Sequence, residues 1–336
     1  MGFDKTSLGN QLDNLWNKDE NTITLATRNK KYAIISDLHM GNGGKSDDFK
    51  ENEKATVNAL KYYRNNGYTL ILLGDIEELW QFSADEVVSE YNDSVYRYMR
   101  DFGDKNIYRV FGNHDIDWKT PDPIRKAQNN NVYEGIKLKD INGNQKIFLI
   151  HGHQGTKDSD KYSAISRGFV RIYRDIEPHM KLDKTAAFPR SPVLTSYERE
   201  RYRWAKKNKL ILICGHSHRA VFCSRTKIDE IRKELQSVIA KTLKNANAST
   251  MGILLLEKKK LEDKLIDEAL LNRNVDFGVK NPAPNYFNTG CGLYSDGVTL
   301  LEIEHDTIRL VKWHRDPSQN YTVYEEGSLS ESIETL

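Results

Sequence analysis

The chain has 336 residues, of which 38% are hydrophobic and 29% are charged. This length and composition allow a sizeable core, in one large domain with additions or in two domains. The 50 lysines and arginines nearly balance the 48 aspartates and glutamates, so the net charge of +2 gives no argument for nucleic acid or a membrane surface as a partner. Three cysteines are too few for a disulfide framework, and no apolar run approaches the length of a transmembrane helix. We therefore expect a cytoplasmic protein without a transmembrane segment.

The first part of the chain, residues 1–30, is polar with scattered apolar positions, which predicts a short N-terminal extension with one helix. Its start, Met1–Thr6, fits the N-myristoylation pattern, which is short and matches often by chance. After it come five apolar runs of four to six residues, rich in β-branched or aromatic residues and bounded by turn residues. This pattern predicts strands buried on both faces. The runs are Tyr32–Ile35, Tyr68–Leu73, Ile107–Phe111, Ile147–Ile150 and Leu210–Cys214.

Helix-like stretches at residues 51–66 and 84–101 separate the first three runs, so we expect crossover units and a largely parallel sheet. Residues 226–272 break this alternation with two apolar stripes at helical spacing, which predict an inserted two-helix hairpin. The acidic, serine-rich end of the chain is predicted to be poorly ordered. The expected division is a core of residues 31–225 and 281–316, an inserted helical hairpin at 226–280, and a flexible tail at 317–336. Within the core, Val298–Glu304 and Ile308–Trp313 are expected to form a terminal β-hairpin.

Each of the five apolar runs is followed by residues that can ligate a metal ion. In open α/β sheets the ligand site lies outside the carboxyl ends of the strands, so these five clusters should converge on one place. Carboxylate, imidazole and amide groups suit zinc, manganese or iron, and no thiolate is needed. The clusters are Asp37-Leu38-His39, Gly74-Asp75, Gly112-Asn113-His114-Asp115, His151-Gly152-His153 and Gly215-His216-Ser217-His218.

The order of these clusters resembles the full motif set of the calcineurin-like metallophosphoesterases, and Asn288–Cys291 resembles the later Asn-x-Gly stretch of that family. The resemblance implies a four-layer α/β/β/α sandwich, here with an inserted helical hairpin, that binds two divalent metal ions (Mn, Fe or Zn). One ion would be held by Asp37, His39 and His218, the other by Asn113, His151 and His216, with Asp75 bridging both. His114 would protonate the leaving oxygen or stabilise the charged transition state, and Asp115 would orient His114.

The activity that this resemblance implies is hydrolysis of a phosphomonoester, phosphodiester or pyrophosphate bond by a metal-bound hydroxide. Two metal ions about 3.5–4 Å apart can share such a hydroxide and neutralise the charge of the reacting phosphoryl group. No serine or cysteine nucleophile is then required. The candidate substrate contacts are His153, Glu78, Arg167 and Arg171. The basic segment 181–210 is either a solvated face or a rim that attracts phosphate.

The segment Asp75–Trp80, together with His151–His153, looks like the UDP-2,3-diacylglucosamine pyrophosphohydrolases of lipid A synthesis, through the acid and the tryptophan that follow Asp75. The chain departs from that branch at His114, where the branch often has arginine, and in its insertion. Three functions therefore remain open: a hydrolase of a phosphorylated small molecule or lipid-linked substrate, a nuclease or protein phosphatase, and a non-catalytic scaffold. The intact ligand set argues against the scaffold, and the charge balance gives a nuclease no strong support. The hairpin could pack on the protein, cap the site or form a homo-oligomer.

Overall fold

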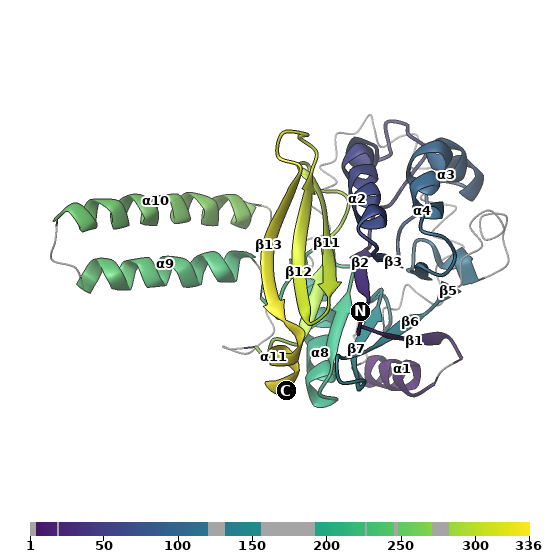
Figure 1. The fold of residues 1–336 in the computed structure, drawn as a ribbon, viewed down its shortest axis with the longest axis horizontal. Helices are drawn as coiled ribbons and strands as arrows, with labels where there is room; N and C mark the ends of the chain where they lie inside the picture. Colours follow the sequence, from purple (N-terminus) through teal and green to yellow (C-terminus); the bar gives the residue numbers. More distant parts are fainter. Residues whose placement is uncertain are drawn as a thin grey trace.

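In the computed structural model two β-sheets lie face to face and helices cover their outer faces, which is the predicted α/β/β/α sandwich (Figure 1). The structure describes residues 5–18, 20–119, 132–155, 192–225, 227–244, 248–270 and 282–336. Three parts of the chain that carried predictions fall outside these ranges: the first four residues, Arg167 and Arg171, and residues 181–191 of the basic segment.

One sheet has the strand order β13-β12-β11-β2-β3-β4-β5. Its half made of β2 (Lys31–Ile35), β3 (Thr69–Leu73), β4 (Ile107–Val110) and β5 (Val132–Tyr133) is parallel. Its other half, made of β11 (Gly297–Glu304), β12 (Thr307–His314) and β13 (Tyr321–Ser328), is antiparallel. The helices of this side are α2 (Glu53–Asn65), α3 (Ala84–Tyr91) and α4 (Arg97–Arg100). A π-helical segment, Asn92–Tyr96, joins α3 to α4, and short 3₁₀ helices lie at Lys50–Asn52 and Ile116–Lys119.

The other sheet has the order β1-β6-β7-β8-β10-β9 and mixes parallel and antiparallel pairs. Its strands are β1 (Thr22–Ala26), β6 (Gly135–Lys139), β7 (Gln145–Ile150), β8 (Ile211–Cys214), β9 (Ala220–Val221) and β10 (Tyr286–Thr289). Helices α1 (Lys5–Asn17) and α8 (Pro192–Lys207) cover its outer face, where Leu8 and Leu12 pack in one cluster with Phe148 and Tyr202.

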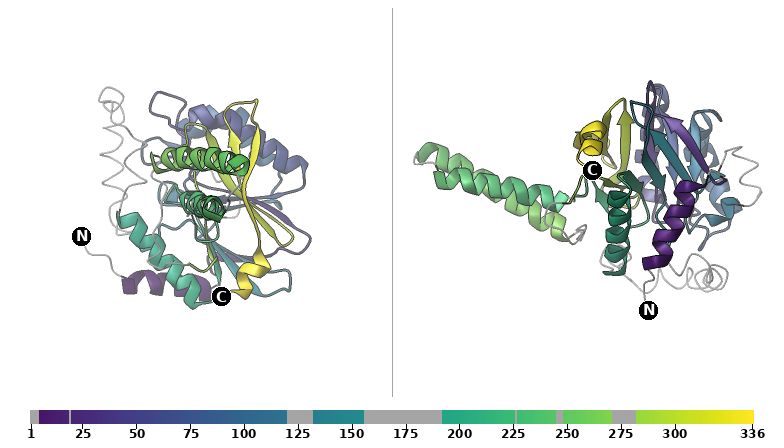
Figure 2. Two further views of the ribbon diagram at one scale, coloured as in Figure 1. Left: turned by 90° about the vertical axis from the view of Figure 1, so that its left-hand side faces the viewer. Right: turned by 90° about the horizontal axis from the view of Figure 1, so that it is seen from below.

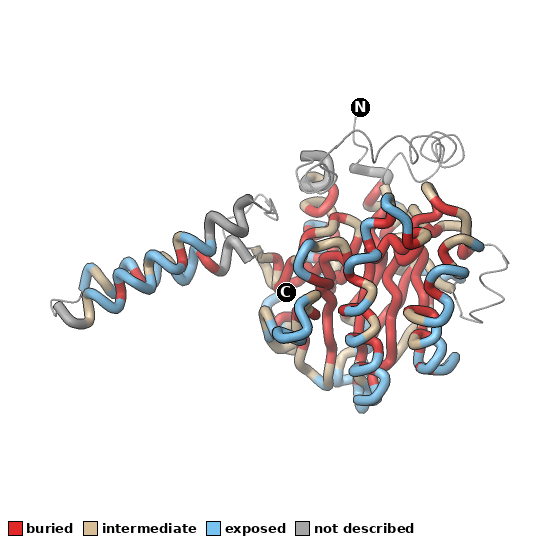
Figure 3. Tube along the Cα trace, turned by 90° about the horizontal axis from the view of Figure 1, so that it is seen from above, coloured by how far each residue is buried: buried red, intermediate tan, exposed pale blue. Residues whose placement is uncertain are grey.

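The alternation of side chains along the strands builds the layers. Ile34 of β2 belongs to the cluster between the two sheets, together with Leu149 and Ile213 from the opposite sheet. Its neighbour Ile35 belongs to the cluster under the helices, with Leu60 of α2. Because successive strand residues point to opposite faces, a continuous apolar run supplies both cores. Figure 3 shows these strands as the buried interior of the molecule.

Two predicted boundaries of the core are wrong. Residues 317–336 are ordered, because β13 pairs with β12 and α11 (Leu329–Glu334) follows it. The Tyr321 hydroxyl donates to Glu302 at 3.0 Å, and Ser328 caps α11 by accepting from the Glu331 amide at 3.1 Å. The extension 1–30 also contributes to the sandwich, because β1 joins the sheet beside β6. Its Thr-Ile-Thr-Leu alternation is a strand pattern that the prediction missed.

The inserted segment contains the two expected helices, α9 (Lys227–Lys244) and α10 (Ala248–Leu270), which project from the sandwich as an antiparallel pair (Figures 1 and 2). Ile231 and Val238 pack against Leu254 and Leu261 in a small cluster of their own. Of the predicted α9 stripe, Ile231, Leu235 and Val238 are therefore covered by α10, whereas Leu243 at its end is exposed.

None of the helices in the described part of the chain combines the length and the apolar character needed to span a bilayer.

Candidate metal centre

The five predicted clusters lie together where strands of both sheets end. Three overlapping groups bring their ligand atoms within 4.8 Å of one another. These groups are Asp37, His39 and His218; His39, Asp75 and His114; and Asp75, His151 and His216. Neighbouring groups share His39 or Asp75, so the three groups form one continuous centre. This centre contains enough candidate ligands for more than one metal ion.

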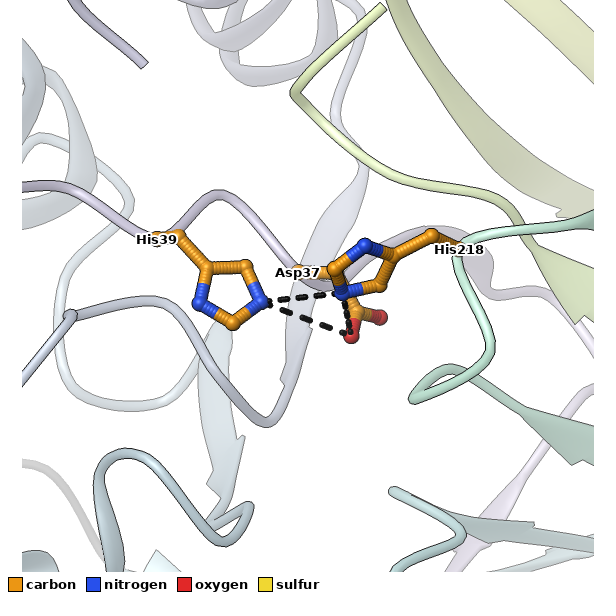
Figure 4. A group of neighbouring side chains, drawn as sticks. All are labelled: Asp37, His39 and His218. Atoms are coloured by element: carbon orange, nitrogen blue, oxygen red, sulfur yellow. Dashed lines mark hydrogen bonds and ion pairs between the residues drawn. The ribbon is translucent and has the colours of Figure 1, made fainter. Parts of the chain in front are cut away.

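The first group joins the loop after β2 to the loop after β8 (Figure 4). His39 Nε2 lies 3.0 Å from His218 Nε2, and His218 Nε2 lies 3.3 Å from Asp37 Oδ1. Two imidazole nitrogens and a carboxylate oxygen thus converge on one point. This is a donor set that a borderline divalent cation accepts without sulfur ligands.

The third group, Asp75 with His151 and His216, lies beside Asn113 of the loop after β4. His151 Nε2 lies 3.0 Å from Asp75 Oδ2, while His151 Nδ1 donates to the Leu73 carbonyl at 2.9 Å. That backbone contact fixes the ring so that Nε2 faces the centre, as in histidines that bind metals. The buried Asn113 Oδ1 accepts no hydrogen bond from any described residue. An amide oxygen left in this state is expensive unless a cation or water satisfies it, so the residues present fit a metal site.

Electrostatics favour the ligating form of most of these groups. Burial raises the pKa of Asp75, but the neighbouring His151 and His114 outweigh it and hold the pKa well below its usual range. Desolvation, together with His151, lowers the pKa of His216 well below its ordinary value, so this ring is neutral at pH 7. Burial also lowers the pKa of His151, yet Asp75 and Asp37 raise it to about 9. A metal ion must therefore displace a proton from His151, which couples metal affinity to pH.

The backbone at the ligands is unusual. Several of the predicted ligands have positive φ, a conformation that L residues other than glycine rarely adopt. Backbone hydrogen bonds between strand ends hold it, from Asp37 N to Gly74 O and from His39 N to Asp75 O, each 3.0 Å. The ligands with positive φ are Asp37 (50°), His39 (50°), Asp75 (51°), His216 (68°) and His218 (56°).

His114 is held by Glu78 and Trp80. Its Nδ1 lies 2.8 Å from the Glu78 carboxylate, and its ring stacks on Trp80 with centroids 4.0 Å apart. Glu78 also contacts His39 Nδ1 at 2.9 Å, so one buried carboxylate positions two histidines. Burial raises the pKa of Glu78, but the contacts with His114 and His39 outweigh it and lower the pKa to about 2.

Two predicted roles need correction. Glu78, expected to contact substrate, is 6% exposed and bonded to His39 and His114. Asp115, expected to orient His114, accepts instead from the backbone amides of Gly112 at 2.6 Å and Ile76 at 2.9 Å. Asp115 therefore connects the loops that follow β3 and β4. The carboxylate that contacts and orients His114 is Glu78 instead.

His153, another candidate substrate contact, is 4% exposed and its ring lies 5.6 Å from that of His151, centroid to centroid. It lies beside His151 and, at this exposure, offers substrate almost no surface. The two candidate arginines fall in the part of the chain that is not described.

The basic segment also supplies structural supports that sequence reasoning missed. Arg201 is buried and donates to the carbonyls of Gly152 and Gln154. Glu198 accepts from the Ser217 hydroxyl at 2.5 Å and pairs with Arg219 at 2.8 Å. These two residues of α8 thus brace the loops that carry His151, His216 and His218. In the sequence, the only indication of this structural role is the spacing of the two residues, which places them on the same face of one helix.

The histidines and carboxylates at the strand ends of this two-sheet sandwich make it a candidate metal-binding protein. The family model for Calcineurin-like phosphoesterase matches residues 30–220, more than half of the chain, and the chain belongs to this family. It is accordingly a metal-dependent phosphoric ester hydrolase, and its substrates are phosphorylated molecules. No curated protein matches the chain.

Proposed function

We propose that the centre binds two divalent metal ions and hydrolyses a phosphomonoester, phosphodiester or pyrophosphate bond in the cytoplasm. The observation that carries the proposal is the overlap of the ligand groups at Asp75. A carboxylate with two oxygens can serve a group on either side of it. The proposed ligands are Asp37, His39 and His218 for one ion, and Asn113, His151 and His216 for the other, with Asp75 shared. The nitrogen and oxygen donors suit Mn, Fe or Zn.

Divalent cations held in such a centre lower the pKa of water and neutralise charge on a phosphoryl group. The remaining chemistry falls to the residues of the chain. Because Glu78 occupies Nδ1 of His114, the Nε2 atom is the one that can deliver a proton to the leaving oxygen. Stacking on Trp80 fixes the plane of the ring, and the Trp80 indole donates to the Asn113 carbonyl at 2.9 Å.

The likeness of Asp75–Trp80 to the UDP-2,3-diacylglucosamine pyrophosphohydrolases does not extend the proposal to a lipid substrate. Glu78 and Trp80 carry that likeness, and both support His114. Any phosphoryl substrate would need this support. We therefore propose a phosphorylated small molecule or a lipid-linked phosphate as the substrate class, with a nuclease or protein phosphatase as the alternative on the same centre.

The proposal is tested by stripping the protein with a chelator and reloading it with Mn, Fe or Zn. Each form is assayed on an aryl phosphate, a bis-aryl phosphodiester, a nucleoside diphosphate ester, a phosphopeptide and single-stranded DNA. We expect hydrolysis to return with the second bound cation and to disappear in His218→Ala. His305→Ala, which removes an exposed histidine on the β11–β12 turn, should behave as wild type. Full activity with one cation, or in the stripped protein, would refute the two-metal centre.

A further inference from the structure

An arginine occupies a core position of strand β4. Ile107 and Phe111, two residues before it and two residues after it, belong to the apolar cluster under the helices, and Arg109 is fully buried between them. Side chains two apart on a strand face the same side, so the pattern would place an apolar residue here. Arginine is almost never buried completely unless it is paired. Arg109 is therefore held in the core by specific partners.

The first partner of Arg109 is Glu77, which is also fully buried. The guanidinium donates to both carboxylate oxygens, from Nη1 at 2.7 Å and from Nη2 at 3.0 Å. Glu77 accepts two more hydrogen bonds, from the Tyr96 hydroxyl and from the Trp118 indole, each at 2.9 Å. A bidentate ion pair fixes direction as well as distance. The Glu77 side chain is therefore held in a single orientation.

Glu77 lies in the segment that supplies the metal centre. Asp75 comes two residues earlier, and Glu78, which contacts two histidines of the centre, is the next residue. The backbone of this segment also pairs with the chain at Met40. The Met40 amide donates to the Ile76 carbonyl at 2.9 Å, and the Glu78 amide donates to the Met40 carbonyl at 3.0 Å. Anchoring Glu77 therefore fixes the backbone from which Asp75 and Glu78 reach the centre.

Arg109 also faces a second buried carboxylate. Its Nη1 atom lies 3.7 Å from Oδ2 of Asp115, and Asp115 accepts from the backbone amides of Gly112 and Ile76. Arg109 thus lies between two carboxylates, one from the loop after β3 and one from the loop after β4. These loops approach closely, because a Cβ atom at Gly112 would lie 2.1 Å from Oδ1 of Asp75. A small displacement of either loop would therefore move the ligands that it carries.

Stability alone does not explain the ion pair. Replacing a buried ion pair by well-packed apolar residues is often neutral or stabilising, and the neighbours of Arg109 on its side of the strand are apolar. Catalysis is more demanding, since a displacement of about 1 Å can cost about 100-fold in rate. We propose that Arg109 and Glu77 are positioning residues, whose ion pair holds Asp75 and Glu78 at the places that the metal centre requires. This rests on the proposed metal-dependent function of the centre.

A double substitution, Glu77→Gln with Arg109→Met, separates positioning from stability. Arg109→Met alone would leave buried carboxylates without their cation, which is strongly destabilising. The double variant removes one anion and one cation together, and the glutamine oxygen can still accept a hydrogen bond. Its control is Glu51→Gln with Arg315→Met, which removes an exposed ion pair. A second variant, Arg109→Lys, keeps the charge but lacks the bidentate fork.

Urea unfolding measures the stability of each variant, and competition with a fluorescent chelator measures its affinity for Mn. Turnover of an aryl phosphate is measured at saturating Mn. We expect the double variant to unfold at nearly the urea concentration of wild type, to bind Mn about 10–100-fold more weakly and to turn over about 100-fold more slowly. Arg109→Lys should fold normally and show smaller losses of both kinds, and the control should match wild type.

Normal Mn affinity and turnover in a folded double variant would overturn the proposal, and so would losses confined to variants of reduced stability. If the double variant does not fold, Arg109→Lys decides, because normal affinity and turnover there would overturn the proposal equally. A wild type without Mn-dependent hydrolysis would refute the proposed function and the positioning role with it. An active wild type beside a normal double variant would refute the positioning role alone.

Discussion

Replacing Glu78 by glutamine tests how the metal centre and His114 are held together. The carboxylate contacts His39 at 2.9 Å and His114 at 2.8 Å. Glutamine keeps the shape of the side chain but removes its charge, and its amide nitrogen cannot accept a hydrogen bond. At least one histidine therefore loses its acceptor, and both lose an anionic neighbour.

The expected magnitude follows from these two contacts. Hydrogen bonds to a charged group contribute about 1.5–3 kcal/mol each, and changing the partner of a metal-binding histidine costs about 10–100-fold in metal affinity or activity. Burial lowers the pKa of His39, but Glu78, with smaller contributions from Asp75 and Asp37, raises it to about 9, so the Glu78 carboxylate makes this ring a stronger base. We expect Glu78→Gln to bind metal about 10–100-fold more weakly.

Competition with a fluorescent chelator measures the metal affinity. Turnover at saturating metal, on aryl phosphates whose leaving groups differ in basicity, measures the effect on His114 separately. A matched control is Glu90→Gln, which neutralises an exposed glutamate of α3. Unchanged metal affinity together with unchanged dependence on the leaving group would refute the positioning role. A lower unfolding temperature alone would show that Glu78 is only structural.

Three further substitutions test other parts of the structure. Asp75→Asn should lower turnover by on the order of 100-fold or more and reduce metal content by elemental analysis, because a shared ligand loses its charge; normal turnover with full metal content would contradict this. His114→Ala should retain its metal and lose about 10²–10⁴-fold on poor leaving groups but much less on nitrophenyl phosphate, whereas loss of metal would make His114 a ligand. Burial raises the pKa of Glu302 above its ordinary 4.5, although the hydrogen bond from Tyr63 opposes this rise. Protonated Glu302 therefore stabilises the folded state at pH values below 4.5, and this contribution is lost as the pH rises through the pKa of the folded state. The stability of Glu302→Gln relative to wild type, from urea unfolding, should therefore increase with pH above about 4.5, and a constant difference would be the contrary result.

The strands and the residues that follow them could be predicted because both depend on local pattern. Runs such as Thr69–Leu73 are buried on both faces, and parallel strands bring their carboxyl ends to one edge. Strand β13 escaped prediction because its residues are only partly buried and include the acidic pair Glu325 and Glu326. An edge strand with one packed face has a weak pattern, and its partner β12 decides its structure.

The support of His114 could not be read from adjacency in sequence. Asp115 follows His114 directly, but its carboxylate bonds to the amides of Gly112 and Ile76. Glu78 lies 36 positions away and reaches His114 because β3 and β4 are neighbours in the sheet. Sequence shows that a carboxylate is available, and only the register of the strands shows which one is close enough.

Several candidate metal ligands have a left-handed backbone conformation that the sequence did not reveal. At Asp37, Asp75 and His216 a glycine would relieve a backbone cost of about 1–2 kcal/mol per residue, yet each position carries a side chain that can bind metal. Sheet hydrogen bonds and the Asn288 amide, which donates to the Gly215 carbonyl at 2.7 Å, hold these turns in place. These positions keep an unfavourable backbone conformation, and their side chains converge on one centre. This indicates that the function of the side chain outweighs the conformational cost of the backbone. Positive φ also occurs away from the centre, at Asn29 and Lys209 for example, so the support for the residues that the motif order selected comes from the convergence of their side chains as well as from the backbone.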